Sequence, residues 1–260
     1  ELVEPYADRP TEGQLLFFVE LSPMASLAFE PGRPSEQAIE LMRLLERSIR
    51  KSQAIDVETL CAVAGKRVWS VRTDVTVIDD CGNVDDAVCA AALAALMSFR
   101  LPAVSIIGAG DQATVRVLPP EQAEPIPLVF HHMPVCVTFG LFRLADRLSV
   151  GIAVDPSDRE ETVMVGKVAI VVNQYGEVCA MQKLGGVAAM PQQMLDCVQQ
   201  AGTIAPVLLA SVHAAMDLFK QRAEERAKHL AKTGRLPQRN VAVGNGETIG
   251  ESSSCCSVRD

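Results

Sequence analysis

Four carboxylates lie close together at 155–161, shortly before an apolar run at 168–172 that has the composition of a strand. They are Asp155, Asp158, Glu160 and Glu161. Carboxylates at the edge of a strand can bind a metal ion or act as general acids and bases. The plainer interpretation is a solvated helical turn, which Asp155 caps ahead of Pro156. The residue types alone leave both interpretations open.

A stripe of charged residues follows helical spacing between residues 36 and 52. At steps of four, three, four and three, its members are Glu36, Glu40, Arg43, Arg47 and Arg50. Arg43 and Arg47 are like charges one turn apart, which costs roughly 0.2–0.5 kcal/mol unless an anion lies against them. Glu46 precedes Arg50 by four residues and can pair with it. The stripe is either a solvated face or a track for RNA phosphates, and periodicity alone favours the solvated face.

Strands and helices in mixed order must position these residues. Apolar and alternating segments bounded by turn residues predict the strands. The predicted strands are 14–21, 60–64, 68–79, 114–118, 135–142, 148–154, 167–172 and 177–184. The last two are expected to form a hairpin across 173–176. Glycines at 108–113 indicate a turn before a strand rather than a nucleotide-binding loop.

Three helical regions are expected between and after these strands. Ser35 is a suitable N-cap for a helix over 36–52. The segment 85–99 is apolar nearly all round, which predicts a helix that is buried on most sides. A helix from Pro191 to about 201 is expected to be interrupted at Gly202 and Pro206, before a second helix runs to about 232. This order indicates an α+β or mixed α/β domain and not a doubly wound parallel sheet.

Composition narrows the class of protein. The chain has 260 residues, 48% of them apolar, which suffices for one large domain. Its formal net charge of −8 argues against a nucleic-acid binder driven by overall charge, so RNA binding would need a local basic patch. The eight cysteines include no C-x-x-C pair, which indicates reduced thiols used as small apolar residues. No uninterrupted run of 18 apolar residues is present, so we expect no membrane partner.

Four segments, in this order, resemble the RNase PH-like subunits of the eukaryotic RNA exosome. They are 12-EGQLLFFVELSPMASLAFEPGR-33, 65-GKRVWSVRTDVTVIDDCGNVDDA-87, 131-HHMPVCVTF-139 and 154-VDPSDREE-161. The resemblance runs from about residue 1 to about residue 230. It implies an α+β, RNase PH-like fold in which a duplicated β-α-β unit packs helices on mixed sheets. We therefore expect one domain over 1–233, which lacks the family's N-terminal helix and first strands, and a flexible polar tail over 234–260.

The resemblance implies that two sites of the active members are degenerate here. Those members bind a metal through two aspartates six residues apart, and the matching positions are Glu161 and Lys167. A lysine ammonium has no lone pair and repels a cation. The arginine that helps hold phosphate falls on Asp85, with Asp86 beside it, and carboxylates at a helix N-terminus repel phosphate. We therefore expect no catalytic residue, no bound metal and no cofactor.

For the arginine stripe, the resemblance favours the track for RNA phosphates over the solvated face. In the family's ring, the corresponding helix of inactive subunits faces a central channel and contacts the RNA backbone. The expected RNA-binding residues are Arg43, Arg47 and Arg50, with Lys51 and Arg33 as weaker candidates.

The resemblance therefore implies a catalytically inactive exosome ring subunit in the nucleus, including the nucleolus, and the cytoplasm. Its expected partners are other RNase PH-like subunits, cap subunits, an associated exonuclease and single-stranded RNA. Two alternatives are an active phosphate-dependent 3′→5′ exoribonuclease and a free-standing scaffold or binding protein of the same fold.

Overall fold

One sheet is built around a parallel pair of strands. The computed structural model describes residues 1–30, 32, 35–107, 114–143 and 150–233. In it, β2 (Gln14–Leu21) runs parallel to β4 (Arg67–Val77), while β1 (Leu2–Val3) and β3 (Cys61–Val63) pair antiparallel with β4. Alternation along β2 buries the odd-numbered side chains from residue 15 to 21 and turns Phe18 and Glu20 outward. The sheet therefore has one face packed on the core and one open face.

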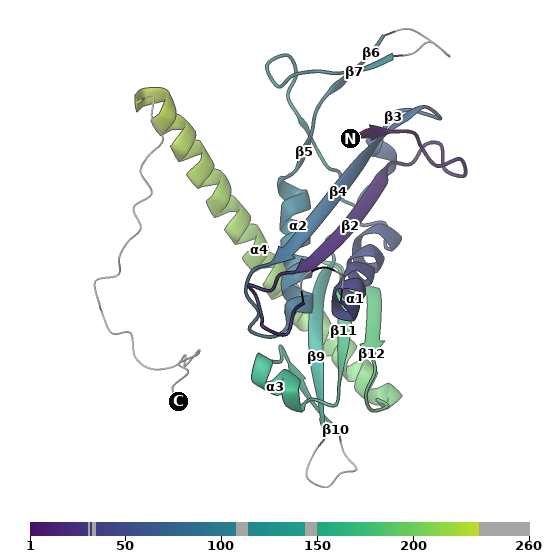
Figure 1. Ribbon diagram of the computed structural model, residues 1–260, viewed down its shortest axis with the longest axis vertical. Helices are drawn as coiled ribbons and strands as arrows, with labels where there is room; N and C mark the ends of the chain where they lie inside the picture. The colour runs from purple at the N-terminus through teal and green to yellow at the C-terminus, as the bar shows by residue number, and fades with distance from the viewer. Residues whose placement is uncertain (31, 33–34, 108–113, 144–149, 234–260) are drawn as a thin grey trace. The chain divides into compact units, whose positions relative to one another are not determined.

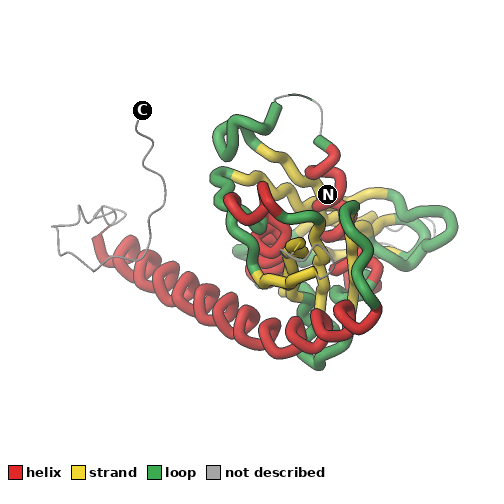
Figure 2. The backbone as a smooth tube through the Cα atoms, turned by 90° about the horizontal axis from the view of Figure 1, so that it is seen from below, coloured by secondary structure: helices red, strands yellow, loops and turns green. Residues whose placement is uncertain are grey.

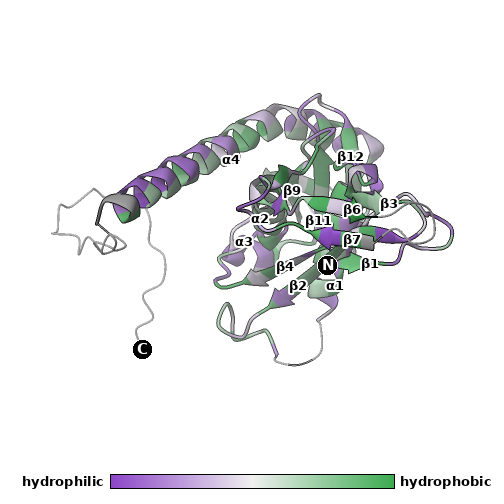
Figure 3. Ribbon diagram, turned by 90° about the horizontal axis from the view of Figure 1, so that it is seen from above, coloured by the Kyte–Doolittle hydropathy of each residue, from purple (hydrophilic) through white to green (hydrophobic). Residues whose placement is uncertain are grey.

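The second sheet is antiparallel throughout. Its order is β10 (Val150–Val154), β9 (Val135–Arg143), β11 (Gly166–Val172) and β12 (Val178–Leu184). The two inner strands, β9 and β11, are buried on both faces, which explains their continuous apolar sequences. Figure 3 shows both strands mostly in the hydrophobic colour.

Helices fill the space between the two sheets. The helix α1 (Glu36–Leu45) continues as a π-helical segment, η1 (Glu46–Lys51), and α2 (Val84–Ser98) follows β4. One core cluster joins side chains of β2, α1 and α2 to Ala169 and Val171 of β11. The other face of β11 packs in a second cluster against α4 (Pro191–Thr233). Figure 1 shows α1 and α2 between the strands of the two sheets.

The remaining elements are short. The pair β5 (Arg100–Leu101) and β8 (Ile126–Pro127) and the pair β6 (Val104–Ile107) and β7 (Thr114–Val117) each form a two-stranded sheet. A single helical turn, η2 (Glu58–Leu60), precedes β3, and α3 (Asp158–Val163) lies between β10 and β11. By internal contacts the chain divides into two units, 1–216 and 217–260, and α4 enters the second unit after Met216.

Most predicted elements are confirmed. All the predicted strands are present, β2 has the predicted bounds, and the hairpin of β11 and β12 turns at 173–176. The predicted N-cap is also confirmed, because Ser35 Oγ accepts from the backbone N–H of Ala38 at 3.1 Å. The predicted turn at 108–113 and the expected tail at 234–260 lie outside the described residues.

One helix prediction is confirmed in extent but not in type, and one is wrong. The helix expected over 36–52 is present, but it is α-helical only to Leu45 and π-helical from Glu46 to Lys51. The helix expected to break at Gly202 and Pro206 is a single helix, as Figure 2 shows. A proline inside a helix costs about 3 kcal/mol. Burial of a stripe of side chains around it opposes that cost. The buried side chains of α4 around Pro206 are Cys197, Ala201, Ala205 and Leu209.

One stretch of α4 resembles a membrane span in length and composition. Among the described residues, Pro191–Leu230 is the one helix that passes this test, which core helices of water-soluble proteins can also pass. Its side chains at Cys197, Ala201 and Ala205 pack in the second core cluster.

Candidate functional site

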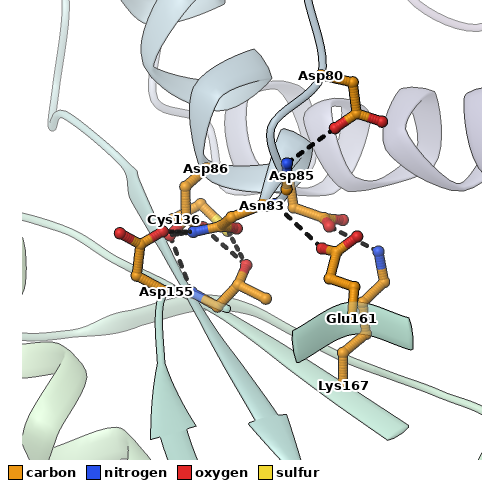
Figure 4. A network of polar contacts seen from close by, with 10 residues as sticks. Asp80, Asn83, Asp85, Asp86, Cys136, Asp155, Glu161 and Lys167 are labelled. Carbon is orange, nitrogen blue, oxygen red and sulfur yellow. Dashed lines mark hydrogen bonds and ion pairs between the residues drawn. The ribbon is translucent and has the colours of Figure 1, made fainter. Parts of the chain in front are cut away.

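The ammonium of Lys167 and the carboxylate of Asp85 form an ion pair. Lys167 Nζ on β11 lies 2.6 Å from Asp85 Oδ2 in the first turn of α2. The side chains are 16% and 4% exposed, so the pair is largely removed from water. The two positions at which the resemblance places reversed charges are therefore neutralised by each other. Figure 4 shows this pair and the groups around it.

Asn83 connects three parts of the chain at the start of α2. It adopts a left-handed backbone conformation with φ 49° and ψ 49°, which asparagine tolerates better than most residues. Its side-chain Nδ2 donates to Asp86 Oδ2 at 2.9 Å and to Asp155 Oδ1 at 2.6 Å. Its backbone N–H donates to Glu161 Oε1 at 3.0 Å. This single residue thus orders three carboxylates that come from α2, the loop after β10 and α3 (Figure 4).

Asp86 is anchored to the second sheet. Its carboxylate accepts from the Thr138 backbone N–H at 3.1 Å and from Thr138 Oγ1 at 2.7 Å. Burial raises the pKa of the Asp86 carboxyl above its ordinary value, while hydrogen bonds from Asn83, Thr138 and Cys136 oppose the rise. Asp86 is therefore a structural link between α2 and β9.

The acidic segment 155–161 is only partly the solvated turn that the sequence suggests. The predicted cap at Asp155 is wrong, because Ser157 is the N-cap of α3 and forms a capping box with Glu160. Asp155 has a left-handed backbone with φ 56° and accepts from Asn83 instead. Glu160 and Asp158 are exposed, whereas Glu161 turns inward to the backbone of Asn83. Through Asp155 and Glu161, the segment accepts hydrogen bonds from Asn83 and so stabilises the start of α2.

Glu161 lies in a mixed electrostatic environment. Burial raises the pKa of the Glu161 carboxyl, the Asn83 N–H and the Lys167 charge oppose the rise, and Asp80 and Asp85 add to it. Asp80 itself accepts from the backbone N–H of Gly82 at 3.0 Å.

The buried Cys136 thiol nearby is not poised as a nucleophile. A hydrogen bond with Cys89 and then burial raise the pKa of the Cys136 thiol well above its ordinary value. A thiol must lose its proton to act as a nucleophile or metal ligand. Cys89 and Cys136 are both buried in the first core cluster, as the sequence predicts for thiols used as small apolar residues.

The arrangement disfavours both halves of metal-assisted phosphate chemistry. Lys167 is a cation at the position where the family resemblance implies a metal-binding carboxylate, and the carboxylates shown in Figure 4 outnumber that one positive charge. A negative cluster at a helix N-terminus repels phosphate. Among the described residues, no group of three or more His, Cys, Asp or Glu side chains is arranged to hold a metal ion.

The arginine stripe is exposed on the outer side of α1 and η1. Arg43, Arg47, Arg50 and Lys51 are exposed. Arg50 pairs with Glu46 at 3.2 Å, whereas neither Arg43 nor Arg47 has an ion-pair partner among the described residues. The π-helical backbone has i→i+5 hydrogen bonds, so Arg50 lies farther round the helix from Arg47 than in an α-helix. Arg33 lies outside the described residues.

Sequence reasoning missed several residues of the network shown in Figure 4. Asn83 and Thr138 were not singled out, although each bonds to Asp86. An Asn immediately before an apolar helix is a recognisable N-cap signal. No comparable signal exists for Thr138, because it is one residue of an apolar strand 52 positions from Asp86.

Comparison with known proteins gives a consistent result. Residues 1–102 match the 3′ exoribonuclease family, domain 1, and residues 132–203 match the same family, domain 2. The chain is similar to "Exosome complex component RRP45A" of Arabidopsis thaliana, with 42% identity over 88% of this chain and 73% of that protein. It is also similar to "Exosome complex component RRP45" of Homo sapiens, with 46% identity over 78% of this chain. The chain spans 73% of the length of the first relative and 44% of the second.

A solved structure supports the fold. The "archaeoglobus fulgidus exosome with RNA bound to the active site" contains a chain that is 32% identical to this one, with a TM-score of 0.68. The match covers 81% of this chain and 75% of that chain.

Proposed function

Because this chain belongs to the 3′ exoribonuclease family, whose similar members are named exosome components, we propose that it is a catalytically inactive ring subunit of the RNA exosome. It supports 3′→5′ RNA processing and degradation that an associated exonuclease carries out. In this role it completes a ring with other RNase PH-like subunits, carries cap subunits on one face and guides single-stranded RNA. It works in the nucleus, including the nucleolus, and in the cytoplasm.

The ion pair between Lys167 and Asp85 carries the proposal that the chain itself does not catalyse. The pair is short, at 2.6 Å, and Asp85 is almost completely buried. A metal ion at this place would have to displace an ammonium that a carboxylate already neutralises. A phosphate would have to approach a helix end that Asp85 and Asp86 occupy. The first event would leave the Lys167 ammonium without its partner, and the second would bring like charges together, so both are unfavourable.

The exposed arginines support the RNA-guiding part of the proposal. Arg43 and Arg47 are exposed and without ion-pair partners among the described residues, and arginine suits contacts to phosphate that ignore base identity. Arg50 forms an ion pair with Glu46, so Arg50 is a weaker candidate for RNA contact than Arg43 or Arg47. Lys51 adds a fourth exposed cation.

The test of the whole proposal is the composition and activity of the native complex. We expect the protein to purify in a one-to-one ratio with other RNase PH-like subunits, as measured by native mass spectrometry. The complex without its exonuclease should release no nucleoside diphosphates from RNA in the presence of phosphate. Phosphate-dependent release of nucleoside diphosphates by that complex would favour the active-enzyme alternative, and a monomer or homodimer would establish the scaffold alternative.

The RNA-guiding part is tested by charge reversal. The variant R43E/R47E should assemble normally and bind single-stranded RNA more weakly at low salt. Loss of two phosphate contacts should lower the slope of log affinity against log salt by about 1.4. The matched control is R67E/R159E, which makes the same change in net charge at two other exposed arginines. Failed assembly with normal RNA binding in the surviving rings would identify the stripe as a subunit interface instead.

A further inference from the structure

The open face of the first sheet carries a hollow that belongs to neither site described above. It has a volume of about 470 Å³ and lies where β2 and β4 meet Pro23, Phe29 and Ser35. Its lining includes Phe18, Glu20, Phe29, Arg72, Asp74 and Thr76. This volume lies in the range of small-molecule sites. None of the residues of the Lys167–Asp85 network or of the arginine stripe lines it.

An arginine lies over an aromatic ring in this hollow. Arg72 Cζ lies 4.5 Å from the centroid of the Phe18 ring, and Arg72 Nε donates to Asp74 Oδ1 at 2.8 Å. The ring and the carboxylate together fix the plane of the guanidinium. The Arg72 side chain is nevertheless 62% exposed, and Phe18 is 42% exposed. We call this pair the Phe18–Arg72 platform.

The polar groups around the platform favour a base over a phosphate. The ionised carboxylates of Glu20 and Asp74 accept hydrogen bonds and donate none, so they repel a phosphate and bind amino groups. Amino groups on the edges of adenine, cytosine and guanine are such donors. Arginine planes and aromatic rings are the surfaces on which proteins stack unpaired bases. The hollow thus combines a stacking surface with acceptors at its side.

We propose that the Phe18–Arg72 platform binds one amino-bearing nucleobase of single-stranded RNA, stacked on the Arg72 guanidinium, with its amino group donating to Glu20 or Asp74. The proposal rests on the proposed RNA-guiding function and adds a base-binding position to it. The sugar and phosphates lie outside the hollow, away from the two carboxylates.

The experiment compares three fluorescently labelled oligonucleotides of equal length: oligoadenylate, oligouridylate and an abasic ribose-phosphate chain. Affinity is measured for the full chain in the complex with which it purifies. The readout is the ratio of oligoadenylate affinity to abasic affinity, which cancels contacts to phosphate. Wild type should prefer oligoadenylate over both other chains, because uracil carries no amino group.

The variant F18A/R72A should lower the oligoadenylate affinity at least about fivefold, the smallest effect typical of one lost stacking contact. It should bring the ratio close to one. Arg72→Lys keeps the charge without the plane and should lower the ratio as well. The control R67A removes an exposed arginine from the same strand and should keep the wild-type ratio. Trp69 fluorescence melting verifies that each variant is folded.

The outcomes separate this proposal from the one on which it rests. Equal losses for oligoadenylate and the abasic chain in F18A/R72A would show that Arg72 acts only as a charge near phosphate, and would overturn the base site. Unchanged affinity for both chains in that variant would also overturn it. Wild-type complex that binds none of the three chains would overturn the RNA-guiding function itself.

Discussion

Replacement of Lys167 by methionine should destabilise the protein by about 3–5 kcal/mol, which is the usual cost when one partner of a buried ion pair is removed. Asp85 is only 4% exposed and would remain as a carboxylate with no positive partner at 2.6 Å. The N-terminus of α2 favours a carboxylate by about 0.3–1 kcal/mol, which is too little to replace the lost ammonium. The predicted loss is therefore large for a single side chain on a strand.

Equilibrium unfolding in urea measures this loss. Trp69, the single tryptophan, packs against the first core cluster and reports on unfolding. With a denaturant dependence near 3 kcal/mol per molar, the midpoint should fall by about 1–2 M. The double variant D85L/K167M removes both charges and should lie within about 1 kcal/mol of wild type, since apolar replacement of a buried pair is commonly neutral or stabilising.

Lys183→Met is the matched control, because Lys183 is exposed on the neighbouring strand β12. It should change the free energy of unfolding by no more than about 0.5 kcal/mol. The reasoning is refuted if K167M unfolds within about 0.5 kcal/mol of wild type. It is equally refuted if D85L/K167M is as unstable as K167M.

Two further variants test the network around the same helix end. Gly82→Ala should destabilise by at least about 2 kcal/mol in urea unfolding, because φ is 96° and a Cβ would clash with the backbone nitrogen of Asp158. Gly176→Ala is the control: its Cβ meets no atom within 4 Å, so it should show only the cost of its positive φ. Asp86→Asn tests the raised pKa of the Asp86 carboxyl. The stability that comes from this raised pKa is fully present below the ordinary value of 3.8 and is lost as pH rises through the pKa of the folded state. As pH falls from 7 to 4, the free energy of unfolding of wild type should therefore increase relative to that of D86N. A stability difference between D86N and wild type that does not change between these pH values would contradict the burial of a charged carboxylate.

Local patterns predict the elements that position the network. The alternation in 14–21 and the spacing in 36–45 give β2 and α1, since one face of each must be buried. The capping box of α3 was also readable, because Ser157 and Glu160 have the required spacing, and the choice of Asp155 overlooked it.

Other features have no local signal. The helix α4 runs through Pro206 because buried side chains on either side of it oppose the local cost, and that burial depends on the second sheet. Nothing in 46–51 indicates a π-helix. The partner of Lys167 is 82 residues away in sequence, so the resemblance could identify two unusual charges but not their contact.

That contact constrains how the sequence can change over generations. A mutation of Lys167 alone to aspartate, the residue type that the family resemblance associates with metal binding there, would place two carboxylates against each other with little access to water. A mutation of Asp85 alone would leave Lys167 without an ion-pair partner beside the N-terminus of α2. Each single step passes through a less stable protein, so the acquisition of a metal-binding aspartate at residue 167 needs both codons to change nearly together. The ion pair thus disfavours stepwise replacement of either residue during the evolution of this protein.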